Sequence, residues 1–339
     1  MSEIRRIDCH VHYLPSAFGD QLSKHRTGRG PVQDVIAARP AWRDLAVHAH
    51  LMEQSSVDIS IIVEPGSLLD GLRGLGGSLN ETVEAYNRSM SEDLTPTNGK
   101  FLAAASVDPF GGREAIRQLG RSLSLPAMVA IGLITSYGGI ALDDPVFEPI
   151  FDLAQERDVP ILVHPSTFPD AWTQALRLDN VFLKTGFGFF IDDALCILRM
   201  ATNGTFDKYP KVRFMFCQLG GMTSICCGRW EFHRRQVIRV QQERGLPLPS
   251  WARKSLGEYL SRVWLDTHTQ DRHALSLVMA EAGDHVIVLG GDHPYTLLEE
   301  GIPYTMAELD AIAVSAKIKR KIECENALNL LGPSAGIAS

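Results

Sequence analysis

Short apolar runs rich in Val and Ile alternate along the chain with longer segments in which apolar residues recur at helical spacing. A short run of this kind predicts a buried strand, and helical spacing predicts an amphipathic helix. Eight runs predict strands, at residues 4–9, 59–63, 101–107, 128–134, 160–163, 212–217, 263–266 and 286–289. The other segments predict helices at residues 43–56, 79–93, 113–123, 146–157, 191–206, 222–239, 271–282, 306–316 and 318–331.

Eight strand–helix alternations predict the α/β class and, within it, a distorted TIM (β/α)8 barrel with loop insertions. A doubly wound nucleotide-binding sheet is disfavoured because no G-x-G-x-x-G follows a strand and enters a helix. The glycine-rich stretch 71–77 lacks the Lys-Ser/Thr of a phosphate loop and predicts a flexible loop. Residues 19–40 and 246–253 predict insertions on barrel loops, and we expect residues 1–339 to form a single domain.

The composition excludes several classes of function. Lys and Arg number 33 against 40 Asp and Glu, a formal net charge of −7, which disfavours nucleic-acid and anionic membrane partners. Hydrophobic residues make up 45% and charged residues 22%, as in globular domains. No apolar run approaches the ~20 residues that span a bilayer and no signal peptide is evident, so we expect a cytoplasmic protein. The six scattered cysteines predict reduced, buried thiols.

Polar residues follow three of the predicted strands at their carboxyl ends, where TIM barrels carry their active sites. The first strand ends in Asp-Cys-His-Val-His, and its period of two places His10 and His12 on the same face. His164 ends the fifth strand, and Asp292 follows the eighth after a pair of glycines. We therefore expect these four side chains to lie close together at the barrel mouth.

Three imidazoles and one carboxylate, with room left for water, are typical of a catalytic divalent metal site. Zinc is the first choice, and manganese, iron or cobalt would also suit these ligands. Taken singly, each motif has a simpler explanation, because a His-x-His is often a packed pair and a strand-end Asp is often a helix cap. Their joint occurrence on the first, fifth and eighth strands favours the metal.

The motifs IDCHVHYLP, ILVHP, KYPKVRFMF, LGGDHPY and ENALNLLG occur in this order and cover nearly the whole chain. Together they resemble the amidohydrolase-related family typified by α-amino-β-carboxymuconate-ε-semialdehyde decarboxylase. The resemblance implies a distorted TIM barrel with one divalent metal, and the fourth strand has no Lys that could bridge two metals. The implied ligands are His10, His12, His164 and Asp292.

The resemblance also implies an oligomer. Arg229 matches a position that binds a substrate carboxylate across a dimer interface, so we expect a homodimer or a higher homo-oligomer. Arg suits this role because its guanidinium is planar and always charged. An exposed helical Arg without a substrate is the simpler alternative.

The sequence departs from the family pattern at the end of the sixth strand. Relatives have His-x-Gly-Gly there, and the His is thought to deprotonate the water at the metal, whereas this chain has Gln218. Gln cannot accept a proton at neutral pH. His268, at the end of the seventh strand, and His293, next to Asp292, are the candidate replacements; we favour His268, because an extended chain turns His293 away from the metal. Gln218 would otherwise position substrate or water.

The loop after the fifth strand also departs from the family. Lys184, Phe187 and Phe189 lie near the position from which relatives contribute an aromatic residue. An amine beside aromatic rings suits a ring or a conjugated acid, although packing alone would also explain the two Phe residues.

Three functions follow from these residues. The first is a metal-dependent, non-oxidative decarboxylase whose substrate is a small aromatic or unsaturated carboxylic acid. The second is a metal-dependent hydrolase of a C–C, ester or amide bond. The third is a decayed barrel kept as a binding protein, which the intact ligand set disfavours. Release of carbon dioxide, a hydrolysis product or neither distinguishes the three.

Overall fold

The computed structural model describes residues 4–24, 38–166, 180, 182–268, 271–296 and 298–337. Its centre is an eight-stranded sheet in the order β1-β2-β3-β4-β7-β8-β9-β10, in which every neighbouring pair is parallel. The strands are β1 (Ile7–Val11), β2 (Ile59–Ile62), β3 (Phe101–Ala105), β4 (Met128–Ile134), β7 (Ile161–His164), β8 (Phe214–Phe216), β9 (Trp264–Asp266) and β10 (Ile287–Val288). All eight predicted strands are present, with ends that differ by up to three residues.

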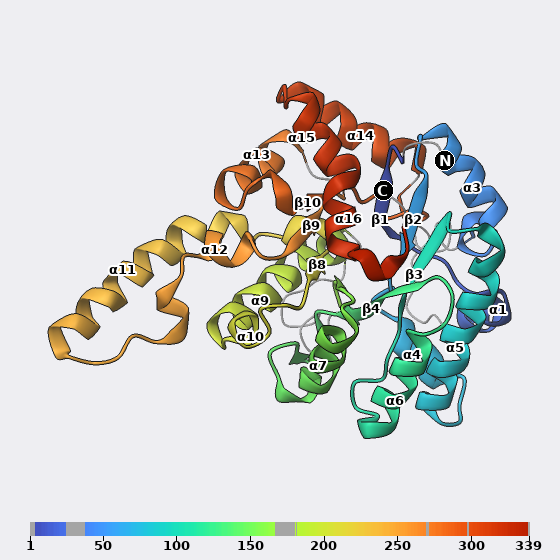
Figure 1. Cartoon of the computed structure of the whole chain (residues 1–339), viewed down its shortest axis with the longest axis horizontal. Coiled ribbons are helices and arrows are strands. Elements are labelled where there is room, and N and C mark those ends of the chain that lie inside the picture. The colour runs from blue at the N-terminus through green and yellow to red at the C-terminus, as the bar shows by residue number, and fades with distance from the viewer. Residues whose placement is uncertain are drawn as a thin grey trace.

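The sheet curves into a barrel because its first strand also meets the chain that continues from its last (Figure 1). The Cys9 amide donates to the Leu289 carbonyl at 2.8 Å, and the His12 amide donates to the His293 carbonyl at 2.7 Å. The predicted distorted TIM barrel is confirmed.

Helices surround the barrel in Figure 1. Those predicted from the sequence, with ends that differ by up to eight residues, are α3 (Leu45–Gln54), α5 (Leu79–Leu94), α6 (Gly112–Ser122), α7 (Glu148–Arg157), α9 (Phe189–Thr202), α11 (Cys227–Arg244), α13 (Arg272–Glu281) and α14 (Leu298–Ala311). The last predicted helix consists of α15 (Ala316–Arg320), the π-helix η9 (Lys321–Glu325) and α16 (Asn326–Leu331). The sequence did not predict α1 (Ser16–Lys24), α4 (Leu68–Gly74), α10 (Thr205–Lys208), α12 (Leu256–Leu260) or the hairpin of β5 (Ser136–Tyr137) and β6 (Ile140–Ala141).

The prediction of a flexible loop at residues 71–77 was wrong for its first half. Residues up to Gly74 belong to α4, in which Leu68, Leu69 and Leu72 are buried. Burial of these three leucines offsets the cost of about 1 kcal/mol for each glycine in a helix. Gly76 and Gly77, with φ of 83° and 80°, do leave the helix. Of the predicted insertion at residues 19–40, residues 25–37 lie outside the described part of the chain.

Two apolar cores place the polar site at one end of the barrel. The larger core lies between the strands and the surrounding helices, and the smaller one fills the barrel interior. In the smaller core, Leu330 and Leu331 of α16 pack with Ile7 and Ile59 at the amino ends of their strands. The C-terminal helix therefore closes one end of the barrel (Figure 1), and the carboxyl ends of the strands form the other. No helix within the described residues is long and apolar enough to cross a membrane.

Candidate metal centre

The carboxyl ends of β1 and β7 and the chain after β10 bring together His10, His12, His164 and Asp292. One ligand atom from each lies within 4.8 Å of the others, and all four residues are buried. The imidazole centroids are 5.1 Å apart for His10 and His12, 5.4 Å for His10 and His164, and 5.1 Å for His12 and His164. The grouping expected from the strand ends is thus present in the fold.

Each of the three imidazoles is oriented by a hydrogen bond from its Nδ1 atom. His10 Nδ1 lies 2.7 Å from Asp266 Oδ2, His12 Nδ1 lies 3.1 Å from the Val63 carbonyl, and His164 Nδ1 lies 2.8 Å from the Pro165 carbonyl. Because these oxygens only accept, each Nδ1 must donate its hydrogen. In the neutral ring the Nε2 atom then carries a lone pair, which is the state that ligates metals.

The carboxylate of Asp292 faces the Nε2 atoms of His10 and His12. Its Oδ1 atom lies 2.9 Å from His12 Nε2 and 3.4 Å from His10 Nε2. Lone pairs on nitrogen and oxygen repel at this distance unless a proton or a cation lies between them. His10 Nε2 and Asp292 Oδ1 are also buried without a hydrogen-bond partner among the described residues. The donor set therefore fits a divalent cation.

The pKa shifts of Asp292 and His10 also indicate a site suited to a cation. Burial would raise the pKa of Asp292, but His268, His10 and His12 outweigh it and hold that pKa well below its usual range. Burial would lower the pKa of His10, but Asp266 and Asp292 raise it to about 9. Without a metal, a proton on His10 supplies positive charge between two buried carboxylates. A divalent cation would supply that charge when bound.

The glycines before Asp292 allow the chain to pass close to two other carboxylates. A Cβ atom at Gly290 would lie 2.7 Å from the Cβ of Asp266, and one at Gly291 would lie 2.7 Å from Oδ2 of Asp8. Asp292 itself has a φ of 53°. Larger residues at the two glycines would displace the chain that carries Asp292.

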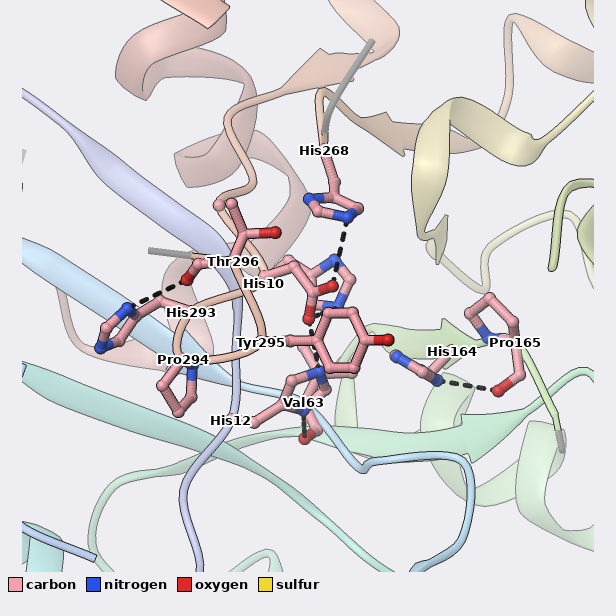
Figure 2. Close-up of polar contacts among 12 residues, drawn as sticks. His10, His12, Val63, His164, Pro165, His268, His293, Pro294, Tyr295 and Thr296 are labelled. Atoms are coloured by element: carbon pink, nitrogen blue, oxygen red, sulfur yellow. Dashed lines mark hydrogen bonds and ion pairs between the residues drawn. The ribbon is translucent and has the colours of Figure 1, made fainter. Parts of the chain in front are cut away.

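His293 points away from the centre, as expected for the residue after Asp292 (Figure 2). Its Nδ1 atom lies 3.3 Å from the Thr296 carbonyl, and its ring centroid is 4.4 Å from that of buried His48. This leaves His268 as the better placed of the two candidate bases. His268 Nε2 lies 3.1 Å from Asp292 Oδ2, and burial is the main cause that lowers its pKa.

Asp266, which the sequence analysis missed, holds three parts of the site together. Besides His10, it accepts hydrogen bonds from the backbone amides of Gln218 at 2.8 Å and His268 at 2.9 Å. Gln218 is buried, with a φ of 53°, and its amide is thereby tied to the end of β9. The sequence does contain a sign of this role, because Asp266 is a polar residue at a strand end, two positions before His268. Buried Trp42, stacked on His12 at 5.8 Å between centroids, was also missed.

The predicted substrate residues are less closely grouped. Phe189, at the start of α9, lies 6.1 Å from His164 between ring centroids. Lys184 and Phe187 lie on the π-helix η4 (Phe182–Gly188), where Lys184 is half-buried and Phe187 is exposed. Arg229 is exposed on α11, a helix that projects from the barrel (Figure 1). Of these four predicted substrate residues, Phe189 is the one with a ring contact to a residue of the centre within the described part of one chain.

Comparison with known proteins identifies the family. A family model described as amidohydrolase matches residues 7–332, which is nearly the whole chain. The chain belongs to the amidohydrolase family. The resemblance to its α-amino-β-carboxymuconate-ε-semialdehyde decarboxylase branch is confirmed by a relative from Dictyostelium discoideum, 2-amino-3-carboxymuconate-6-semialdehyde decarboxylase, which is 22% identical over 96% of this chain and 91% of its own.

Other amidohydrolase relatives are also named as decarboxylases. A gamma-resorcylate decarboxylase from Polaromonas sp. is 22% identical over 74% of this chain and 76% of its own. The crystal structure of 5-carboxyvanillate decarboxylase from Novosphingobium aromaticivorans, with bound manganese, superimposes with a TM-score of 0.78 over 97% of both chains at 21% identity. A 2,6-dihydroxybenzoate decarboxylase structure reaches a TM-score of 0.80 at 17% identity, over 97% of this chain and 99% of that one. These structural likenesses establish the shared fold.

Proposed function

We propose that this amidohydrolase is a metal-dependent, non-oxidative decarboxylase of a small aromatic or unsaturated carboxylic acid. The observation that carries the proposal is the convergence of one ring nitrogen from each of three histidines and one carboxylate oxygen within 4.8 Å at the barrel mouth. The relatives named above, all decarboxylases, favour this function over the hydrolase and over a decayed binding protein.

The same proposal assigns one divalent ion to His10, His12, His164 and Asp292. When bound, such an ion supplies a Lewis acid that binds and polarises the oxygens of a carboxylic acid. Three imidazoles make zinc our first choice, and manganese is the alternative that the carboxyvanillate decarboxylase structure suggests. Asp266 and the carbonyls of Val63 and Pro165 would keep the three rings in the ligating tautomer.

His268 is the proposed proton-transfer group. In non-oxidative decarboxylation a C–C bond breaks, carbon dioxide leaves, and the remaining carbon takes a proton. His268 Nε2 lies 3.1 Å from Oδ2 of Asp292, a proposed metal ligand. A proton held between these two atoms would therefore lie beside the place where the substrate acid binds. Gln218 cannot accept a proton at neutral pH, so it takes no part in this transfer. Positioning of substrate or water by Gln218 is the alternative, in which catalysis works without a histidine base.

We further propose that the enzyme is a homodimer that uses α11 as its contact. In Figure 1 this helix extends away from the barrel. Ile225, just before α11, is 70% exposed, and Phe232 on it is 55% exposed. Exposed apolar residues on a projecting element are typical of an interaction surface. Arg229 lies between them in the sequence and would be carried to the neighbouring subunit's site, where Lys184 and the two Phe residues would complete the substrate pocket.

The test is metal analysis of the purified protein followed by activity screening of the metal-loaded form. Hydroxybenzoates, aminobenzoates and unsaturated ring-cleavage acids are the substrates to offer, with carbon dioxide release and the product mass as readouts. We expect one divalent ion per chain and a product lighter by one carbon dioxide. A product formed by addition of water would contradict the proposal.

A further inference from the structure

Glu64 is a buried acid at the barrel mouth to which the proposed mechanism gives no role. It follows β2 by two residues, and it is 3% exposed, comparable with His12 at 3% and Asp292 at 5%. The carbonyl of its neighbour Val63 is the acceptor for His12 Nδ1. Glu64 is therefore one residue away from a group that orients a proposed metal ligand, and it is as enclosed as the ligands themselves.

The side chain of Glu64 points into the barrel. A Cβ atom built at Gly132 of β4 would lie 3.1 Å from the Glu64 Cβ and 3.5 Å from its Oε2. Gly132 shares a face of β4 with Ile134, whose partner in the sheet is His164, so this face is turned toward the metal centre. The Cβ of Ala104 on β3 lies 3.4 Å from the same built atom. Small residues on two strands thus leave the space that the Glu64 carboxyl group enters.

Neither oxygen of the Glu64 carboxyl group has a partner at full hydrogen-bond geometry among the described residues, although the Ser106 hydroxyl is close enough to act on it as a weak donor. Burial raises its pKa to about 8, with the nearby Ser106 hydroxyl opposing this shift only in part. At neutral pH the group is therefore mostly a carboxylic acid, with one O–H to donate and one carbonyl oxygen to accept. A buried polar group without a partner costs stability, and a group that hydrogen-bonds a ligand is one of the explanations for keeping it.

We propose that Glu64 is a specificity-determining residue whose carboxyl group hydrogen-bonds a hydroxyl or amino substituent of the acid substrate. This inference rests on the proposed function, since it assumes that an acid bound at His10, His12, His164 and Asp292 extends over β2 to β4. The observations that favour a hydrogen-bonding substituent are the enclosure of Glu64 and the space beside Gly132 and Ala104 that its carboxyl group enters. A site built to hydrogen-bond a substituent rejects the analogue that lacks it, because its own group is then left unpaired.

The experiment measures equilibrium binding of acid pairs to the manganese-loaded protein by calorimetry. Benzoate is compared with each monohydroxybenzoate and each aminobenzoate, in the wild type, Glu64→Gln and Glu64→Met. For at least one substituent position we expect the wild type to prefer the substituted acid by ten-fold or more. Glu64→Gln, which keeps a donor and an acceptor, should retain that ratio, and Glu64→Met should reduce it to about one.

Asp193 provides a matched control, because it is also fully buried with both carboxylate oxygens unpartnered among the described residues. It lies on α9, outside the strands. Asp193→Asn should change the affinities of both members of a pair by the same factor. A Glu64→Met variant that keeps the wild-type ratios, or a wild type without any preference, overturns the assignment. Discrimination in binding without carbon dioxide release would contradict only the decarboxylase function, and carbon dioxide release with unchanged ratios would contradict only the role of Glu64.

Discussion

Three hydrogen bonds from Nδ1 atoms prepare the imidazoles of His10, His12 and His164 for a cation. Removing one of these rings should cost metal affinity rather than stability, since a ligand at the barrel mouth contributes little to the core. We expect His12→Ala to lose the metal while retaining its cooperative unfolding transition, as measured by elemental analysis and circular dichroism. His50→Ala, an exposed histidine on α3, is the control and should keep its metal. A His10/His12 double substitution with stoichiometric metal would refute the ligand assignment.

The proton-transfer role can be tested at His268 and Gln218. General acid–base groups contribute about 10² to 10⁴-fold, or about 3 to 5 kcal/mol of barrier. We expect His268→Ala to lower kcat by that factor with metal content unchanged, and Gln218→Ala to cost much less. If Gln218 instead positions substrate or water, its removal should cost at least as much. Near-wild-type turnover by metal-replete His268→Ala would exclude the histidine.

The buried carboxyl group of Glu64 should make stability depend on pH. Its pKa is about 8 in the folded protein against 4.5 for the free side chain, so its charged form is disfavoured by folding. Its effect on the free energy of unfolding is absent below pH 4.5 and becomes unfavourable as the pH rises toward 8. Linkage gives a loss of about 3 kcal/mol between pH 5.5 and 8.5.

This dependence is measurable by urea unfolding of the metal-free protein at both pH values. The wild type should lose more stability over the interval than Glu64→Gln, because Gln does not ionise. Glu156→Gln, an exposed residue on α7, should behave as the wild type. Equal losses in the wild type and Glu64→Gln would mean that Glu64 is already ionised at pH 5.5.

Among the elements, strands were predictable and helix ends were not. The barrel strands are short and mainly apolar because they are covered on both faces, and the polar residues within them, such as Asp8 and His10 of β1, do not hide the pattern. The convergence of His10, His12, His164 and Asp292 then follows from the fold, since the carboxyl ends of parallel strands lie at one end of a barrel. In contrast, α4 contains two glycines and α14 contains Pro303, and both helices depend on packing that local propensity does not reveal.

The parts of the site that the sequence did not predict depend on contacts between elements. Asp266 has a role only because β9 lies near the ends of β1 and β8, where it meets His10 and the Gln218 amide. Glu64 points into the barrel only because Ala104 and Gly132 on the next two strands are small. Neither arrangement is visible in the residues that flank these two acids.

The projecting helix α11 can be tested through Arg229. If its guanidinium holds a substrate carboxylate in the neighbouring subunit, Arg229→Ala should raise KM by at least ten-fold, since a charge-assisted contact contributes about 1.5 to 3 kcal/mol. Metal content should stay the same. Arg239→Ala, on the same helix and paired with Glu243 on the surface, should leave KM unchanged. Equal KM values for the two variants would mean that Arg229 is an exposed surface residue that does not bind substrate.

For the whole molecule, a single domain over residues 1–339 and a cytoplasmic location stay predictions, and assembly is the property that decides whether the site is complete. In one chain, Arg229 is exposed on α11, which extends away from the barrel that holds the metal centre (Figure 1). We expect the wild type to be a homodimer by light scattering. Substituting Ile225 and Phe232 together by Asp should give a monomer, because two charges would replace the most exposed apolar side chains of this surface.

The monomeric variant should keep its metal and its fold, since both substituted side chains are exposed and the four ligands belong to one chain. Its turnover should fall with KM raised, as in Arg229→Ala, because each site would lack the guanidinium of its neighbour. Mixing Arg229→Ala with an inactive His268→Ala variant adds a second measurement: in a mixed dimer one site has both His268 and the partner's Arg229, so activity should recover. A wild type that is monomeric and fully active would show that each barrel works alone.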